Sequence, residues 1–150
     1  EMNLNSEYIE VDLKTKKIIY SSASHEAAIV LPGWSSQQEP TRVLKKSDFQ
    51  YLADVHGRRL GEASDSTYGQ STAEFNFGDT LFMYTDGLPD CRNKLGKSLG
   101  ERGLLNAIIK TKQVRRAKDL LDVVSDEVSK HRKDEPLPDD VSYLVVHLKS

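Results

Sequence analysis

The first third of the chain alternates short apolar runs with polar turns, which is typical of a β-rich region. Apolar and polar residues alternate with period two over Tyr8–Leu13, and an apolar run resumes at Ile18–Tyr20 after the polar residues 14–17. These two runs predict a β-hairpin. A third apolar run, Ala27–Leu31, ends at Pro32-Gly33, a pair that interrupts regular structure.

The middle of the chain is less regular. Val43-Leu44 predicts a short edge strand, whereas Asp48–Val55 fits a helical turn as well as a strand. The pattern becomes clear again at Ala73–Phe77, which alternates like a half-buried strand. Gly78-Asp79 then predicts a tight turn, and the apolar and β-branched run Thr80–Thr85 predicts a buried strand.

The last third changes to helical periodicity. Apolar residues recur at helical spacing over Leu104–Ile109 and again from Ala117 to about Lys130, so two amphipathic helices are expected. Pro136 and Pro138 prevent the second helix from continuing. The final run, Val141–Leu148, is apolar on both faces and predicts a strand in the centre of its sheet. Strands and helices do not alternate, so the pattern predicts a layered α+β domain.

The composition is that of an ordinary globular protein. The 150 residues are 37% hydrophobic and 29% charged, which is enough for one domain over residues 1–150. The net charge of −2 argues against nucleic acid or a membrane surface as a partner. No apolar run approaches the roughly 20 residues of a membrane helix.

Two further features concern the origin of the chain. The single cysteine, Cys91, cannot form an internal disulfide, which favours a reducing cytoplasmic location and a role as a small buried hydrophobe. The chain begins at Glu1 with Met only at position 2, and no signal peptide opens it. We therefore expect an excised C-terminal portion of a longer cytoplasmic protein, whose absent segments could still tether it to a membrane.

Three acids stand at the ends of predicted strands. Asp86 follows the strand Thr80–Thr85, and Asp139 and Asp140 precede the strand Val141–Leu148. If the two strands are antiparallel neighbours, these acids meet at one rim of the sheet, a geometry that suits a hard divalent cation. Each acid could equally belong to a local turn, because Asp is common in turns.

The order of several short motifs resembles the C-terminal half of a bacterial PPM-type serine/threonine phosphatase, in the subgroup of stage II sporulation protein E. The segment Ile18–His25 is similar to the family strand that ends in Ala-Gly-His. The other matching segments are Thr85-Asp86-Gly87, Asp90, Arg92-Asn93, Leu99–Arg102 and Asp139–Ser142. The resemblance implies an antiparallel β-sandwich flanked by helices.

The resemblance also implies a chemistry. Asp86 and Asp139, with Asp140 as second choice for the latter, would bind two Mn²⁺ or Mg²⁺ ions that activate water for attack on phosphorus. The substrate would be a phosphoserine or phosphothreonine of a regulatory protein. An anti-sigma-factor antagonist in bacterial stress signalling is the expected partner.

The chain departs from the family pattern in two places. The family's metal-bridging Asp-Gly motif precedes the strand Ile18–His25, and the chain begins too late to contain it. Asp54–Gly57 imitates that motif but follows the strand, so we interpret it as a chance match. Ser24 replaces the glycine of Ala-Gly-His, and His25 is expected to pack at the strand end rather than bind metal. Alone, the chain should bind Mn²⁺ weakly and hydrolyse little substrate.

Two other interpretations remain open at this point. The chain could be a non-catalytic phosphatase-like module that acts by interaction or dimerisation, or an α+β scaffold unrelated to phosphatases. A chain without its early strands would leave sheet edges unpaired, which favours a homodimer.

Overall fold

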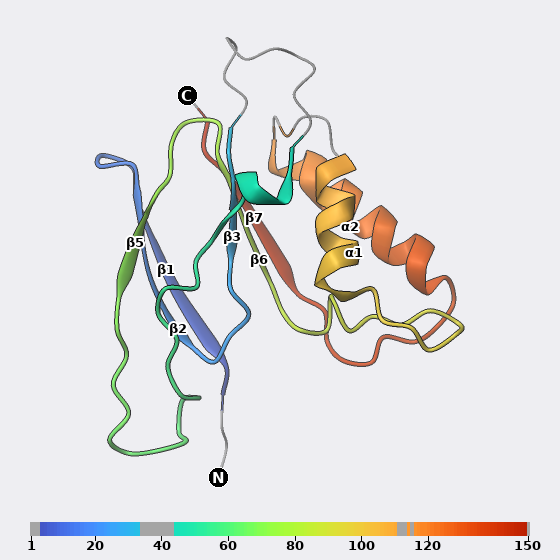
Figure 1. Cartoon of the computed structure of the whole chain (residues 1–150), viewed down its shortest axis with the longest axis horizontal. Coiled ribbons are helices and arrows are strands. Elements are labelled where there is room, and N and C mark those ends of the chain that lie inside the picture. The colour runs from blue at the N-terminus through green and yellow to red at the C-terminus, as the bar shows by residue number, and fades with distance from the viewer. Residues whose placement is uncertain (1–3, 34–43, 111–113, 115, 150) are drawn as a thin grey trace.

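The computed structural model describes residues 4–33, 44–110, 114 and 116–149, arranged as two packed sheets with two helices on one side (Figure 1). The first sheet has the strand order β1-β2-β5. Its strands are β1 (Ser6–Asp12), β2 (Lys17–Ala23) and β5 (Ser71–Glu74).

The second sheet lies between the first sheet and the helices. Its strand order is β4-β3-β6-β7, and every neighbouring pair is antiparallel. The strands are β3 (Ile29–Leu31), β4 (Gln50–Tyr51), β6 (Thr80–Tyr84) and β7 (Tyr143–His147). The helices α1 (Gly100–Lys110) and α2 (Ala117–Arg132) cover its other face (Figure 1). The predicted α+β sandwich flanked by helices is therefore confirmed.

Two hydrophobic cores separate the three layers. One core lies between the sheets and includes Ile18, Tyr20 and Leu81. The other lies between the second sheet and the helices, where Phe82 and Leu104 are fully buried. Because successive residues of a strand face opposite sides, Leu81 and Phe82 of β6 serve different cores. This explains why β6 reads as a continuous apolar run.

Most predicted elements are present with small shifts in their bounds. The hairpin forms from β1 and β2, and both predicted helices are found at their expected places. The strand expected at Ala73–Phe77 is displaced to Ser71–Glu74. Residues 48–55, which fitted either class, supply the end of a 3-10 turn at Lys46–Asp48 and then β4. Val43 lies outside the described residues, and Leu44 belongs to no strand.

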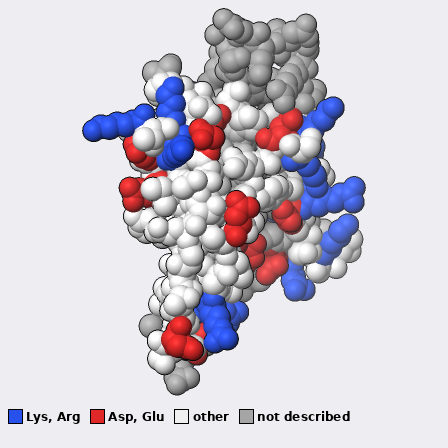
Figure 2. All heavy atoms as spheres, turned by 60° about the vertical axis from the view of Figure 1, so that its left-hand side comes forward, with Lys and Arg blue, Asp and Glu red and all other residues white. Residues whose placement is uncertain are grey.

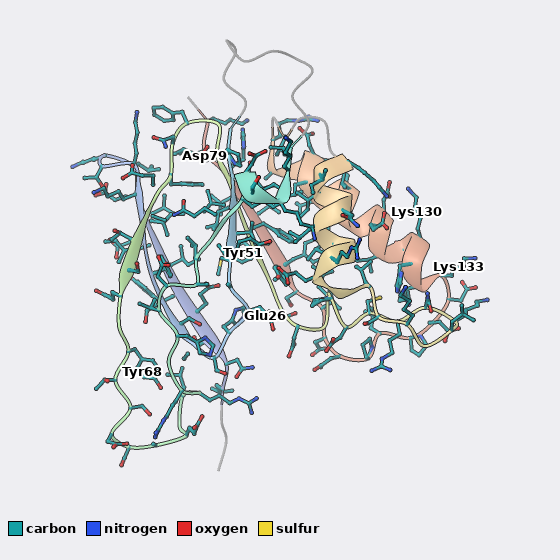
Figure 3. All side chains as sticks on the ribbon, viewed as in Figure 1. Glu26, Tyr51, Tyr68, Asp79, Lys130 and Lys133 are labelled. Atoms are coloured by element: carbon teal, nitrogen blue, oxygen red, sulfur yellow. The ribbon has the colours of Figure 1, made fainter. Side chains whose placement is uncertain are left out.

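The turn before β6 is held by Asp79. Its Oδ1 accepts a hydrogen bond from Gly33 N at 2.6 Å, and its Oδ2 accepts one from Asn76 N at 2.7 Å. Gly78 has a φ of 92°, a conformation that suits glycine. The predicted tight turn is therefore confirmed, and Asp79, labelled in Figure 3, also ties β6 to the end of β3.

The prediction that the last strand is central is wrong, because among the described strands β7 pairs with β6 alone and forms an edge of the second sheet. Its two apolar faces have another origin. Val145 packs in the core beneath the helices, whereas Val146 packs against the core between the sheets. A strand in the middle layer of three needs apolar residues on both faces, even when it lies at the edge of its sheet. Apolar residues on both faces therefore indicate that both faces are covered, and they do not indicate the strand's position within the sheet.

The surface shows no concentration of one charge on the face drawn in Figure 2. Acidic and basic side chains are interspersed there, in keeping with the net charge of −2. Within the described residues, no helix combines the length and apolar character needed to cross a membrane.

Candidate metal centre at the ends of β6 and β7

The end of β6 and the approach to β7 are joined by Thr85 and Ser142. Thr85 N donates a hydrogen bond to Ser142 O at 2.9 Å, and Ser142 N donates one to Thr85 Oγ1 at 3.0 Å. The Thr85 hydroxyl also lies 3.3 Å from the carbonyl oxygen of Asp140. The exit of β6 therefore lies beside the entrance of β7, as the sequence predicted.

Gly87 allows these two segments to approach closely. A Cβ at this position would lie 2.5 Å from the carbonyl oxygen of Asp140, which is closer than any real Cβ contact. Gly87 is buried, whereas Asp86 beside it is exposed. The absence of a side chain at Gly87 thus lets the Asp140 backbone lie against the turn that presents Asp86.

The three predicted ligands are available to different degrees. Asp86, Asp139 and Asp140 are all exposed. Asp139 Oδ1 accepts a hydrogen bond from the adjacent Asp140 N at 2.7 Å, so part of this carboxylate is held in its own bend. Across the part of the chain that is described, no three His, Cys, Asp or Glu side chains gather as a metal site. The structure brings the two segments together without completing a ligand set.

Asp86 and Thr85 line a small pocket whose other walls come from Asn5, just before β1, and from the connection between β2 and β3. The pocket has a volume of about 130 Å³, and neither Asp139 nor Asp140 lines it. Its lining residues are Asn5, Ser24, His25, Glu26, Thr85 and Asp86. Asp86 thus shares this pocket with the β2–β3 connection, where Figure 3 labels Glu26.

A buried carboxylate lies behind this pocket. The side chain of Glu7 is only 1% exposed, and its Oε2 has no hydrogen-bond partner among the described residues. His25 Nδ1 is 3.6 Å from that oxygen and 2.9 Å from the carbonyl oxygen of Glu26. Because a carbonyl can only accept, His25 Nδ1 carries a proton in this arrangement. Burial raises the pKa of Glu7, and the nearby Ala28 N–H and His25 oppose that rise.

The backbone before His25 is unusual. Ser24 has a φ of 58°, in the left-handed region that non-glycine residues seldom adopt. This explains why the family strand resembling Ile18–His25 has glycine at this position. His25 itself is 18% exposed at the strand end, so it is largely packed there, as the sequence predicted.

Tyr84, the last residue of β6, is buried and has acidic neighbours. Burial raises the pKa of Tyr84 well above its usual range, and the negative charges of Glu101 and Glu26 raise it further. Glu7 adds to the same effect. Negative charge near the end of β6 is favourable for a divalent cation, although these carboxylates form no ligand cluster in the described part of the chain.

Two residues outside the site have structural roles. The carboxylate of Asp54 accepts a hydrogen bond from the Tyr20 hydroxyl at 3.0 Å, which suits the interpretation of Asp54–Gly57 as a chance match. Cys91 is fully buried, and burial raises the pKa of its thiol. It therefore packs as a small hydrophobe, as expected.

Sequence reasoning missed Glu7 and Glu26. Glu7 lies in the alternating β1 strand, where its partner in register is the buried Ser22. The alternation puts Glu7 on the same face of β1 as Ile9 and Val11, which pack against the core. Nothing in the sequence indicates that Glu7 lies close to His25. Glu26 follows the strand end and carries no local signal of its own.

The sequence matches the family Stage II sporulation protein E (SpoIIE) over residues 2–149. Phosphoserine phosphatase RsbU of Bacillus subtilis (strain 168) is 26% identical over 142 residues, which is 95% of this chain and 38% of RsbU. Protein IcfG of Synechocystis sp. is 21% identical over 137 residues, which is 91% of this chain and 19% of that protein. The chain thus spans well under half of these curated relatives.

Solved structures show the same fold at low sequence identity. The SiaA-PP2C domain of Pseudomonas aeruginosa has a TM-score of 0.75 at 15% identity, covering 99% of this chain and 53% of that one. The Mn-presoaked phosphatase domain of SpoIIE from Bacillus subtilis has a TM-score of 0.60 at 13% identity, covering 97% of this chain and 56% of that one. These likenesses establish the architecture.

Proposed function

Because the chain belongs to the SpoIIE family, we propose that it forms part of a metal-dependent protein serine/threonine phosphatase. The observation that supports this best is the junction of β6 and β7, where hydrogen bonds between Thr85 and Ser142 join the segment before Asp86 to the segment after Asp139 and Asp140. Carboxylate oxygens are the ligands that Mn²⁺ and Mg²⁺ prefer. The solved SpoIIE phosphatase domain that resembles this chain was presoaked with Mn.

Each residue of the junction has a separate task in this proposal. Asp86 and Asp139 would hold the cations, with Asp140 as the alternative to Asp139. When bound, two divalent cations would supply a hydroxide for attack on the phosphoryl group. Thr85 fixes the backbone of residues 140–142, and Gly87 keeps the Asp140 carbonyl close to the turn. Positions 86, 139 and 140 alone make an incomplete site, so a further carboxylate must complete it.

We propose that the substrate is a phosphoserine or phosphothreonine on a regulatory protein of sigma-factor signalling. RsbU, a relative over most of this chain, is a phosphoserine phosphatase. A phosphorylated antagonist of an anti-sigma factor fits this role. The homodimer expected from unpaired strand edges stays a prediction, which size-exclusion chromatography with light scattering would test.

One observation favours a second candidate function, a non-catalytic phosphatase-like interaction module. Asp139 Oδ1 is engaged by Asp140 N, and no three-ligand cluster forms within the described ranges. A module of this kind would keep the fold and the partner but bind no metal. Metal binding by the full-length protein therefore separates the two functions.

The test compares Asp86→Asn with Asp65→Asn in the full-length protein. Asp65 is an exposed acid in the loop before β5, so its replacement is the matched loss of one charge. We expect Asp86→Asn to weaken Mn²⁺ binding in calorimetry and to lower p-nitrophenyl phosphate hydrolysis at least 100-fold, with unchanged thermal unfolding. Asp65→Asn should match the wild type. Full activity in Asp86→Asn would disprove the proposal, and no Mn²⁺ binding by the wild type would favour the module.

Two further measurements refine the site. Asp139→Asn and Asp140→Asn, compared singly, identify which acid is the ligand, and we expect the larger loss of Mn²⁺ affinity at Asp139. The 150-residue chain alone should bind Mn²⁺ weakly and hydrolyse little p-nitrophenyl phosphate. Robust hydrolysis by this chain would show that its own residues complete the site.

A further inference from the structure

Residues 91–99, which follow the Asp86 turn along the chain, form a hydrogen-bonded hairpin. Leu99 N donates a hydrogen bond to Cys91 O at 2.8 Å, and Asn93 N donates one to Lys97 O at 3.0 Å. At the tip, Asn93 Oδ1 accepts hydrogen bonds from Leu95 N at 3.0 Å and Lys97 N at 3.1 Å. The position of Leu95 is therefore set by a defined turn.

The hairpin tip forms a pocket with the end of α2. His131 Nε2 lies 2.9 Å from the carbonyl oxygen of Lys97, which joins the helix to the hairpin. The pocket between them has a volume of about 300 Å³. We call it the basic pocket, and its lining residues are Asn93, Lys94, Leu95, Lys130, His131 and Lys133.

The positive charges of the basic pocket are poorly neutralised. Lys94 Nζ is 4.0 Å from Asp134, whose side chain is 95% exposed, so this pair contributes little. Lys130 and Lys133 form no ion pair with any carboxylate in the described part of the chain. Three lysines thus surround one pocket on a chain whose net charge is negative.

The helix dipole explains only part of this arrangement. Basic residues are favourable in the last turn of a helix, which accounts for Lys130 and His131 on α2. It does not account for Lys94, which comes from a different segment. Nor does it account for Leu95, which is 90% exposed although its turn is well ordered by hydrogen bonds. An exposed leucine beside lysines of which only Lys94 has an ion-pair partner among the described residues is the composition of a docking surface.

We propose that the basic pocket docks an acidic segment of a protein partner, with an apolar side chain of that segment packed on Leu95. Because opposite charges attract, carboxylates of the partner would bind Lys94, Lys130 and Lys133. A small anion would leave Leu95 uncovered. A membrane surface fits less well, because the site is concave and the exposed carboxylate of Asp134 lies at its edge.

The basic pocket lies apart from the candidate metal centre. Figure 3 labels Lys130 on α2 and Lys133 just after its end, whereas Glu26 lies on the sheet side of the helices. A segment bound there would extend a partner's contact beyond the phosphorylated residue. The inference rests on the proposed function only for the identity of the partner as a phosphatase substrate; the binding itself is testable without catalysis.

The experiment uses the full-length protein and a short fluorescein-labelled peptide in which pairs of Glu alternate with single Leu residues. The test variant is Lys130→Glu/Lys133→Glu. The control is Lys14→Glu/Lys17→Glu, which makes the same charge change on two exposed residues, one in the β1–β2 turn and one at the start of β2. Fluorescence anisotropy should show binding to the wild type that weakens about tenfold between about 50 and about 300 mM NaCl.

We expect the test variant to lose at least tenfold in affinity and the control variant less than twofold. Leu95→Ser should lose about fivefold without changing the salt dependence, because it removes apolar contact only. Equal losses in both double variants, or no loss in the test variant, would overturn the inference. Binding to phosphatidylserine-containing vesicles through these lysines, without peptide binding, would overturn it in favour of a membrane.

Catalysis separates this inference from the proposed function. The test variant should hydrolyse p-nitrophenyl phosphate at the wild-type rate, because its lysines line a different pocket from Asp86. Unchanged peptide binding in that variant would refute the docking site alone. An Asp86→Asn protein that stays active would refute the proposed function and leave the peptide result standing.

Discussion

Gly87 and the carbonyl oxygen of Asp140 lie so close that a Cβ on Gly87 would be 2.5 Å from that oxygen. The two residues belong to segments that are far apart in sequence and are joined by the hydrogen bonds between Thr85 and Ser142. The contact fixes how the Asp86 turn meets the acids before β7. A side chain at Gly87 would therefore disturb the backbone that joins the two halves of the candidate metal centre.

Gly87→Ala should force the backbone around Asp140 away from the Asp86 turn. We expect a loss of about 1–3 kcal/mol in the free energy of unfolding, the usual cost of overpacking, together with weaker Mn²⁺ binding by the full-length protein. Urea denaturation and calorimetry measure the two effects. Gly69→Ala is the matched control, because its Cβ would meet only Val55 Cγ1 at 3.5 Å. Equal stability of both variants would contradict the importance of this contact.

Ser24→Gly should stabilise the protein. The φ of 58° at Ser24 costs an L-residue about 1–2 kcal/mol, whereas glycine adopts it freely and loses about 0.5–1 kcal/mol through greater freedom in the unfolded chain. We therefore expect a net gain of about 0.5–1 kcal/mol in thermal or chemical unfolding. Ser21→Gly, within β2, should instead be destabilising, since glycine weakens a strand. A loss of stability in Ser24→Gly would show that its side chain matters more than its backbone.

Glu7 should make stability depend on pH. Burial raises its pKa in the folded state above 4.5, so the folded protein holds this proton more tightly than the unfolded chain. Its contribution is favourable below pH 4.5 and is lost as the pH rises through the raised pKa. In Glu7→Gln, the fall in unfolding free energy as the pH rises above 4.5 should be smaller than in the wild type.

The control for this measurement is Glu74→Gln, at an exposed acid in β5. Its pH dependence should follow the wild type, because other titrating groups are common to all three proteins. A Glu7→Gln protein with the full wild-type slope would mean that the buried carboxylate does not titrate in this range.

Local sequence was sufficient for the elements that depend on local physics. The β1–β2 hairpin, the buried run of β6 and the two amphipathic helices follow from periodicity and turn residues, which act over a few positions. The same reasoning placed Asp86 at a strand end, because the turn Asp86-Gly87 marks where the apolar run stops. The order of short motifs was enough to identify the family.

Only the tertiary structure could show which distant groups share a site. The edge position of β7, the proximity of Glu7 to His25, and the role of Asp54 as a partner of Tyr20 each depend on contacts between separate segments. The basic pocket likewise exists only because the hairpin tip meets the end of α2. Periodicity states which face of an element is buried, but what lies against that face is set by the packing of the whole chain.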